Sequence, residues 1–304
     1  MNNRQKAYAA LSITSIVWGT SWIGSRIAVQ YAPAFEVAAI RQGLAGLLFV
    51  GFFLIKGEKL PTWYQLKWMA IMSILLFVSA NGLATIGLKY ISGGLGALIA
   101  ALYPLSVVII ERIFFKNNKI TGFTFLGIFL GIGGIALVFY ENAFHQQGPG
   151  YIFGVIVSMI AMLSWSIGTI LITRKKLNIN PYYATGLQMF CASFFLAIMA
   201  AVSGDMVPIS RIPMQTWLSI GYLVLMGSVV AYAAFIYTMK YLEPSVAALY
   251  AYINPIVATI IGSLLINEAL TTNIMIGSVI TLAGVYIVNQ SLKKERKALV
   301  EPIE

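Results

Sequence analysis

Ten runs of mostly apolar residues follow one another along the chain, each close to the roughly 20 residues that cross a bilayer as a helix. Charged residues make up 10% of the chain, against about 25% in a typical soluble domain. Lipid offers the backbone no hydrogen-bond partners, so the runs must form helices or a closed barrel. They are too long and too uniformly apolar for barrel strands. The sequence therefore predicts an all-α integral membrane protein with ten spans, at 7–26, 33–55, 67–88, 92–114, 121–140, 150–172, 182–203, 215–239, 244–266 and 273–290.

One stretch of the chain occurs twice. Residues 88–105 read LKYISGGLGALIAALYPL, and residues 239–256 read MKYLEPSVAALYAYINPI. At an offset of 151, six of the eighteen aligned pairs are identical, and one of them pairs Pro104 with Pro255. Trp18 also recurs, as Trp165 at an offset of 147. Because the period is about half the chain, we predict two copies of one five-span unit.

The odd number of spans in each copy determines how the copies are related. The second copy must enter the membrane upside down, which is the inverted-repeat arrangement of secondary transporters. We expect a first five-helix repeat over 1–140, an extracytoplasmic linker over 141–149, an inverted second repeat over 150–292 and a basic tail over 293–304.

The distribution of positive charge predicts the orientation. Of the twenty Lys and Arg residues, sixteen fall on the side of the two termini, three fall on the other side, and Arg41 lies within a span. The positive-inside rule then places both termini in the cytoplasm. The same distribution accounts for the net charge of +10, so the charge does not indicate a nucleic-acid partner.

Two tryptophans lie away from the membrane interface, where tryptophan is normally found. Trp18 is about 16 Å along the first span at 1.5 Å per residue, close to Ser21 and Trp22. It could be a packed core aromatic or part of a cavity lining. Its recurrence as Trp165 favours the cavity.

Arg41 lies about eight residues inside the second span, where a cation is costly unless it faces protein or water. One interpretation is a structural arginine that bonds Glu36 or helix carbonyls, within a local network that includes Arg26. The other is a residue of the permeation path that contacts an anionic group. The sequence favours the structural interpretation, and in the second repeat Gln188 takes the place of this arginine.

Pro104 and Pro255 both lie near the middle of a span, where each displaces a backbone carbonyl, that of Ala100 or Ala251. Transporters often place binding sites at such broken helices. Polar and aromatic residues accompany the two prolines and the two tryptophans. The predicted substrate-binding set is Trp18, Ser21, Trp22, Asn81, Tyr103, Pro104, Trp165, Tyr232, Tyr250, Tyr252, Asn254 and Pro255. Which of the tyrosines face the cavity stays open at this stage.

The residue types that most enzymes need are scarce. The single histidine, His145, falls in the linker, and the single cysteine, Cys191, falls in a span. This composition argues against an enzyme, a metal centre, a bound cofactor and an internal disulfide. Small residues recur on the faces of the fifth and tenth spans, at Gly127, Gly131, Gly134, Gly277 and Gly284. We expect these faces to pack within one subunit, which favours a monomer, and a dimer seam is the alternative.

The segments IVWGTSWIG, the duplicated block around Pro104, and MKYLEPSVAALYAYINPI running on to NEALTTNIMIGSVITLAGVYIV resemble the ten-helix EamA-type branch of the drug/metabolite transporter superfamily. The resemblance covers about residues 8 to 290 and implies an inner-membrane protein that moves small metabolites, often amino acids outward, through a central cavity. The chain departs from the pattern where the counterpart of Glu268 reads NNKIT. Asn117 or Asn118 stands there, which puts a paired acid in doubt.

These observations predict a secondary transporter for a small amino-acid-like metabolite, working by alternating access at a cavity between the repeats. No acidic residue falls in the first span or near mid-depth in any other, so facilitated diffusion or exchange is favoured over proton coupling. A proton-coupled exporter of drugs or other metabolites, and a non-transporting receptor or structural membrane protein, remain alternatives.

Overall fold

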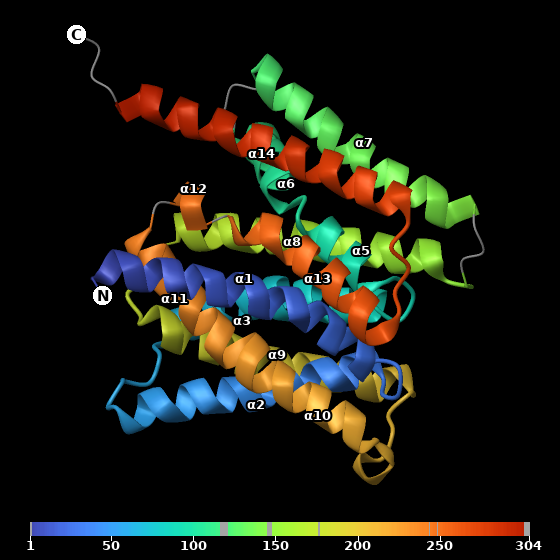
Figure 1. Cartoon of the computed structure of the whole chain (residues 1–304). Helices are drawn as coiled ribbons and strands as arrows, with labels where there is room; N and C mark the ends of the chain where they lie inside the picture. The colour runs from blue at the N-terminus through green and yellow to red at the C-terminus, as the bar shows by residue number, and fades with distance from the viewer. Residues whose placement is uncertain are drawn as a thin grey trace.

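The computed structural model of this chain describes residues 2–115, 121–144, 148–175, 177–242, 244–247 and 249–300. Within these residues every regular element is a helix, and the helices assemble into ten spans (Figure 1). In chain order the spans are α1 (Asn3–Ala28); α2 (Ala34–Ile55); α3, η1 and α4 (Trp63–Ser73, Ile74–Gly82, Leu83–Gly87); α5, α6 and η2 (Gly93–Ala100, Tyr103–Ile110, Glu111–Phe115); α7 (Gly122–Phe144); α8 (Tyr151–Arg174); α9 (Pro181–Ser203); α10, η4 and α11 (Met214–Tyr222, Leu223–Val230, Ala231–Tyr241); α12 and α13 (Pro244–Ala247, Tyr250–Ile266); and α14 (Thr272–Val300). A short 3₁₀ helix, η3 (Ile209–Arg211), lies between α9 and α10.

The predicted all-α membrane fold is confirmed. Seven spans are long and apolar enough to cross a membrane, and two more, at 122–138 and 250–266, are shorter apolar helices. The remaining span, α1, has 26 residues and buries Thr14, Ser15, Ser21 and Ser25 against the rest of the protein. Its polar side chains belong to the interior of the bundle, which is why α1 is less apolar than its neighbours.

The contacts between helices follow an inverted repeat. In the first half, α1 packs on α10, η4 and α11 and on α13 of the second half. In the second half, α8 packs on η1 and α4 and on α5 and α6 of the first. The remaining pairs, α2 with α9 and α7 with α14, each join equivalent helices of the two halves. This pattern pairs the helices of one half with those of the other, as an inverted repeat requires, and the unit boundaries at 140 and 150 stay predictions.

Both ends of the bundle can be recognised from the course of the chain. The start of α1 and the end of α14 lie at the same end, on the left of Figure 1, which we call the terminal face. The loop from α9 to α10 lies at the other end, which we call the opposite face. Of the predicted linker, residues 145–147, which include His145, lie outside the described residues, as do 116–120 with Asn117 and Asn118 and the last four residues of the tail.

The described residues include three π-helical segments, and two of them lie at equivalent places in the repeat, the third being η2. The first is η1 (Ile74–Gly82) and the second is η4 (Leu223–Val230), so their first residues are separated by 149 positions. In a π-helix each turn takes up an extra residue, and such segments often occur at functional sites. Segment η1 lines the cavity described below through Ala80 and Asn81, and η4 accepts hydrogen bonds from two of its lining residues.

The duplicated prolines do not produce equivalent breaks. In the first half α5 ends at Ala100, Ala101 and Leu102 form a turn, and Pro104 lies in the first turn of α6. In the second half α13 continues as a helix through Pro255. The prediction of two matched midplane breaks is therefore wrong for the second half, where helix α12 ends at Ala247 and α13 begins at Tyr250.

The glycine faces of α7 and α14 pack against each other within the chain. A methyl group on Gly284 would lie 2.5 Å from the Gly127 carbonyl oxygen, and one on Gly134 would lie 2.6 Å from the Gly277 carbonyl oxygen. Only glycine permits backbones to approach so closely. Packing within one subunit thus accounts for the spacing of these glycines.

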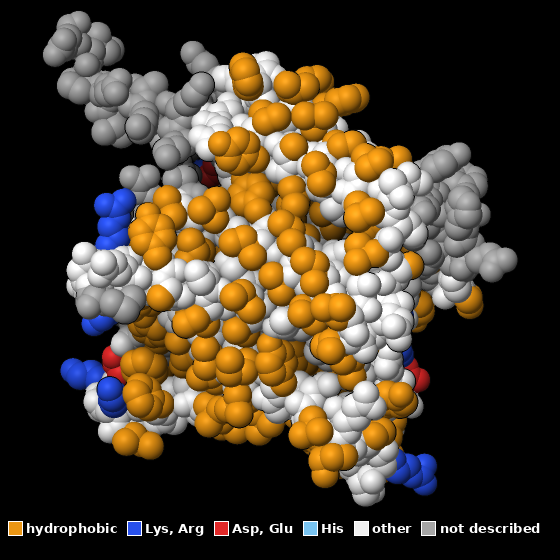
Figure 2. Space-filling view, in the orientation of Figure 1, with side chains coloured by type: hydrophobic (Ala, Val, Ile, Leu, Met, Phe, Trp, Pro, Cys, Tyr) orange, Lys and Arg blue, Asp and Glu red, His pale blue; other side chains and the backbone are white. Residues whose placement is uncertain are grey.

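The outer surface has the character of a membrane protein. In Figure 2 hydrophobic side chains cover the middle of the visible face, and Lys and Arg side chains lie toward its two ends. Exposed large side chains include Phe123, Phe129 and Leu264. Such a surface is far more apolar than a soluble monomer tolerates, so these side chains face lipid.

Candidate substrate cavity

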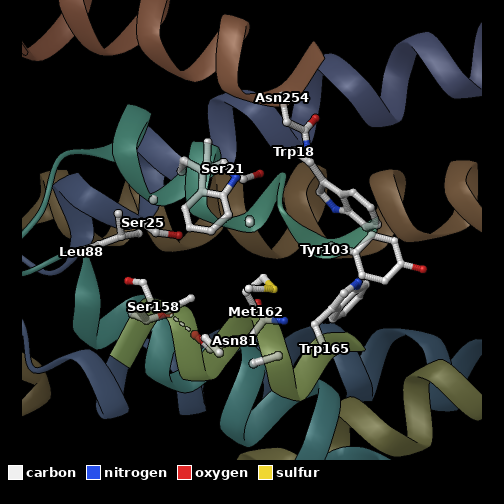
Figure 3. A pocket seen from close by; sticks show the side chains of 18 of the residues that line it. Trp18, Ser21, Ser25, Asn81, Leu88, Tyr103, Ser158, Met162, Trp165 and Asn254 are labelled. Atoms are coloured by element: carbon white, nitrogen blue, oxygen red, sulfur yellow. Dashed lines mark hydrogen bonds between the residues drawn. The ribbon is translucent and has the colours of Figure 1, made fainter. Parts of the chain in front are cut away.

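A cavity of about 160 Å³ lies in the centre of the bundle, between the two repeats. Figure 3 shows several of its side chains converging from different helices. The first half contributes Trp18, Ser21, Trp22, Ser25, Arg41, Ala80, Asn81, Ala84, Thr85, Leu88, Gly96, Ala97, Ala100, Ala101 and Tyr103. The second half contributes Ser158, Ala161, Met162, Trp165, Tyr232, Tyr250, Ala251 and Asn254.

Aromatic rings bound the cavity toward the terminal face, and we call this group, Trp18, Trp165, Tyr232 and Tyr250, the aromatic floor. Trp18 is its centre. Its ring centroid lies 5.0 Å from that of Tyr232, 5.1 Å from that of Tyr250 and 6.4 Å from that of Trp165. All three pairs meet edge to face, an arrangement that aromatic rings prefer. The floor therefore joins four different spans through ring contacts.

Helical spacing explains how several of these side chains reach one space. On α1, Trp18, Ser21, Trp22 and Ser25 recur at intervals of three and four residues, which places them on one helix face. On α8, Ser158, Met162 and Trp165 have the same spacing.

The π segment η4 makes direct contacts with α1 and α2. The Trp18 Nε1–H donates to the Gly227 carbonyl oxygen at 3.1 Å, which fixes the central ring of the floor. From α2, the Arg41 Nε–H donates to Ser228 Oγ at 3.0 Å. On the other π segment, η1, the Asn81 amide donates to the Leu76 carbonyl oxygen at 3.2 Å. The two π segments thus position three of the cavity residues.

Arg41 is buried, with 8% of its surface exposed, and it lines the cavity. It does not bond Glu36, which accepts from the Val207 N–H at 3.1 Å instead. Arg26 is also separate, since it donates to the Leu88 carbonyl oxygen. The structural network of these three residues that the sequence favoured is therefore not formed.

Toward the opposite face, helix ends are tied together by a group that we call the polar cover, consisting of Arg26, Leu88, Gly93, Gly94 and Glu268. The Glu268 carboxylate accepts from the Gly93 N–H at 2.7 Å and from the Gly94 N–H at 3.2 Å. These two amides open helix α5, where an anion is favoured by the helix dipole. The bonds join the loop after α13 to the start of α5, so they link the two repeats beside Leu88, which lines the cavity.

Of the residues predicted from sequence, Trp18, Ser21, Trp22, Arg41, Asn81, Tyr103, Trp165, Tyr232, Tyr250 and Asn254 all line the cavity. Pro104, Tyr252 and Pro255 do not. The Tyr252 hydroxyl donates to the Val285 carbonyl oxygen at 3.1 Å, so this side chain faces α14. In the orientation that satisfies its amide, Asn254 donates to the Ser15 carbonyl oxygen at 2.7 Å and thereby joins α13 to α1.

Sequence reasoning missed several lining residues, among them Ser25, Thr85, Ser158 and Met162. The available signal was spacing: Ser25 follows Ser21 by four residues, and Thr85 follows Asn81 by four. Polar residues at such intervals mark one face of a helix. In the described part of the chain, no group of three or more His, Cys, Asp or Glu side chains is placed to hold a metal ion.

Comparison with known proteins identifies the family to which the chain belongs. A sequence model of the EamA-like transporter family matches residues 5–140 and again residues 152–290. The chain is 30% identical over 267 residues to an uncharacterized inner membrane transporter, YedA, of Escherichia coli, covering 87% of this chain and 84% of that protein. It is 28% identical to the uncharacterized transporter sll0355 of Synechocystis, covering 90% of this chain and 87% of that one. A solved crystal structure matches with a TM-score of 0.66 at 16% identity, covering 96% of this chain and 99% of the other, and supports the fold alone.

Proposed function

The chain belongs to the EamA-like transporter family and is a multi-pass membrane transporter, and from that premise we propose that it moves a small amino-acid-like metabolite by alternating access at the central cavity. The observation that carries the proposal is the place of the cavity, which both inverted repeats line at the middle of the bundle. In inverted-repeat transporters the two repeats rock against each other around such a site.

The chemistry of the lining supports an amphipathic solute. The aromatic floor offers apolar surface and ring faces that attract an ammonium group. Ser21, Asn81 and Ser158 offer hydrogen-bonding groups. A cavity of about 160 Å³ is close to the roughly 150 Å³ of an engineered cavity that holds benzene, so it suits a molecule of a few heavy atoms such as a small neutral amino acid.

The lining also supports transport without a proton-binding carboxylate. The described lining residues include no aspartate or glutamate, and the Glu36 and Glu268 carboxylates, outside this lining, accept hydrogen bonds from backbone amides. A proton relay through a membrane usually requires a titratable group on the path. We therefore propose facilitated diffusion or exchange, with the solute moving outward.

For the orientation, we propose that the terminal face is cytoplasmic, on the basis of the positive-inside rule. A single cysteine at Arg211, on the opposite face, then reacts in intact cells with a thiol reagent that cannot cross the membrane, in a Cys191→Ser background. A cysteine at Lys59 does not react. The reversed pattern would contradict this orientation.

The proposed function is tested by uptake into liposomes across a panel of amino acids, sugars and dicarboxylates, each measured with and without a pH gradient. Neutral amino acids are expected to enter, and the gradient is expected to leave the rate unchanged. Transport of sugars or dicarboxylates alone would refute the substrate class. Dependence on the pH gradient would refute the mechanism and favour the proton-coupled alternative.

A further inference from the structure

We propose that Arg41 is the carboxylate-binding residue of the cavity, so that a transported solute must carry a carboxylate group. This inference rests on the proposed function and narrows its substrate class. It starts from a buried cation for which the described protein supplies one neutral hydrogen-bond partner.

Arg41 is more than nine-tenths buried and lies in a membrane span. Its guanidinium has five N–H donors, and one of them, Nε–H, is bonded to the neutral oxygen of Ser228 at 3.0 Å. Among the described residues no acidic side chain lies within ion-pair distance of it. A buried guanidinium usually has a carboxylate or carbonyls around it, because an uncompensated charge is costly inside a protein. Arg41 therefore retains donors for a partner that enters the cavity.

The Arg41 guanidinium lies close to Gly227 of η4, where a side chain would crowd it and Ser21. A methyl group on Gly227 would lie 3.4 Å from Arg41 Nη2 and 2.7 Å from Ser21 Oγ. Arg41, Ser21 and the π segment η4 thus converge at one side of the cavity. The bond from Nε to Ser228 fixes one edge of the planar guanidinium, and the terminal amino groups can then pair with the two oxygens of a carboxylate.

The charge of Arg41 and the rings of the aromatic floor would together orient a bound solute. Arg41 is the only charged residue among those that line the cavity. The aromatic floor provides rings for an apolar or ammonium-bearing part. A carboxylate at Arg41 would leave the remainder of the solute to contact the floor, which matches the polarity of a neutral amino acid.

The second repeat indicates which residue can replace Arg41 in a test. Gln188 occupies the place that corresponds to Arg41, and it is also buried. Arg41→Gln therefore introduces the residue that the fold already accommodates at the equivalent position. Arg41→Lys keeps the charge and removes the fork of paired donors. Arg211→Gln removes one exposed arginine far from the cavity and serves as the matched control.

The experiment compares leucine, leucinamide, 4-methylpentanoate and inorganic phosphate as ligands of the full-length protein. Each is tested as a competitor of leucine uptake in liposomes and, independently, by titration calorimetry with detergent-solubilised protein. Wild type is expected to bind leucine more tightly than leucinamide by about tenfold to a hundredfold, the range for a hydrogen-bonded charge. In Arg41→Gln the two are expected to bind equally, in Arg41→Lys the ratio is intermediate, and Arg211→Gln matches wild type.

Several results would overturn the inference. Equal binding of leucine and leucinamide by wild type would remove the carboxylate requirement. An unchanged ratio in Arg41→Gln would show that another group binds the carboxylate. Inorganic phosphate that competes as well as 4-methylpentanoate would replace an organic carboxylate with a free anion as the ligand. If leucine binds as expected in calorimetry and no solute crosses the liposome membrane, the proposed transport fails while the carboxylate site stands.

Discussion

At the terminal end of the cavity four aromatic rings from four spans meet, whereas at the opposite end one carboxylate and one guanidinium hold helix ends through hydrogen bonds. Trp18 is the centre of the aromatic floor, and Glu268 is the centre of the polar cover. Each joins the first repeat to the second. They do so through different forces, since ring contacts act over an area and hydrogen bonds act between particular atoms.

This difference indicates how each end can open. Loss of the polar cover frees a few amides that water can satisfy, which lowers the cost of separating the helix ends there. Separation of the aromatic floor exposes rings, and a bound solute with an apolar part can replace the lost ring contacts. We therefore propose that the floor and Arg41 chiefly recognise the substrate and that the cover controls access from the opposite face.

Of the two ends of the cavity, the aromatic floor is expected to show the larger effect. Trp18 contacts the rings of Trp165, Tyr232, Phe235 and Tyr250, whereas Trp165 contacts those of Trp18 and Tyr232. We expect Trp18→Ala to weaken apparent substrate affinity more than Trp165→Ala, with each loss in the range of about twofold to thirtyfold for a cation–π contact. Trp→Phe at either position should be milder because it keeps a ring. Measurement of half-saturating concentrations in liposomes decides this, and full affinity in both alanine variants would make the two tryptophans packing residues.

A smaller effect is expected at the cover. Glu268→Ala removes the acceptor of the Gly93 and Gly94 amides, and the opposite end should open more often. A cysteine in place of Ser25, beside Arg26, then reacts with an impermeant thiol reagent about tenfold faster, in line with the loss of one or two hydrogen bonds to a charged group. Asp205→Asn, a change to an exposed acid near the same face, is the control and leaves the rate unchanged. The same rate in Glu268→Ala as in the control would show that the cover does not limit access.

The smallest effect is expected at the two prolines, and it should differ between them. Pro104→Ala allows the turn at Ala101 and Leu102 to become helical, which draws the Ala100 carbonyl back into the helix and narrows the cavity. Pro255→Ala acts on a helix that is already continuous. Initial transport rates should fall in both variants and fall further in Pro104→Ala. Equal, wild-type rates in both would show that neither proline shapes the site.

Much of the candidate site could be predicted because several of its residues are types that rarely occur near the middle of a membrane span. Trp18, Trp165 and Arg41 stand out in apolar spans, and each lines the cavity. Tyr250 and Asn254 also line it, four residues apart on one face of α13, and Tyr252 has the wrong helical phase and faces α14. Sequence alone does not separate the two tyrosines, because the direction of each side chain depends on how the helix is rotated about its axis.

Other features of the site could not be predicted from the types of the residues that form them. Ser25, Thr85 and Ser158 are ordinary in membrane helices, and only their intervals of four residues from other cavity positions mark them. The π segments η1 and η4 rotate the side chains that follow them in the same span to a different face of the helix. No residue type in either segment predicts the extra residue per turn. The unequal breaks near Pro104 and Pro255 arise from tertiary context, since the local sequences are closely similar.

The most direct test of the central claim, a site between the repeats that faces each side in turn, is substrate-protected labelling from both faces. Ser158→Cys in a Cys191→Ser background places one thiol in the cavity wall. An impermeant reagent is applied to right-side-out and to inside-out vesicles, with and without leucine. We predict reaction from both sides and slower reaction from both when leucine is present. Reaction from one side alone, unaffected by any transported solute, would contradict alternating access at this cavity.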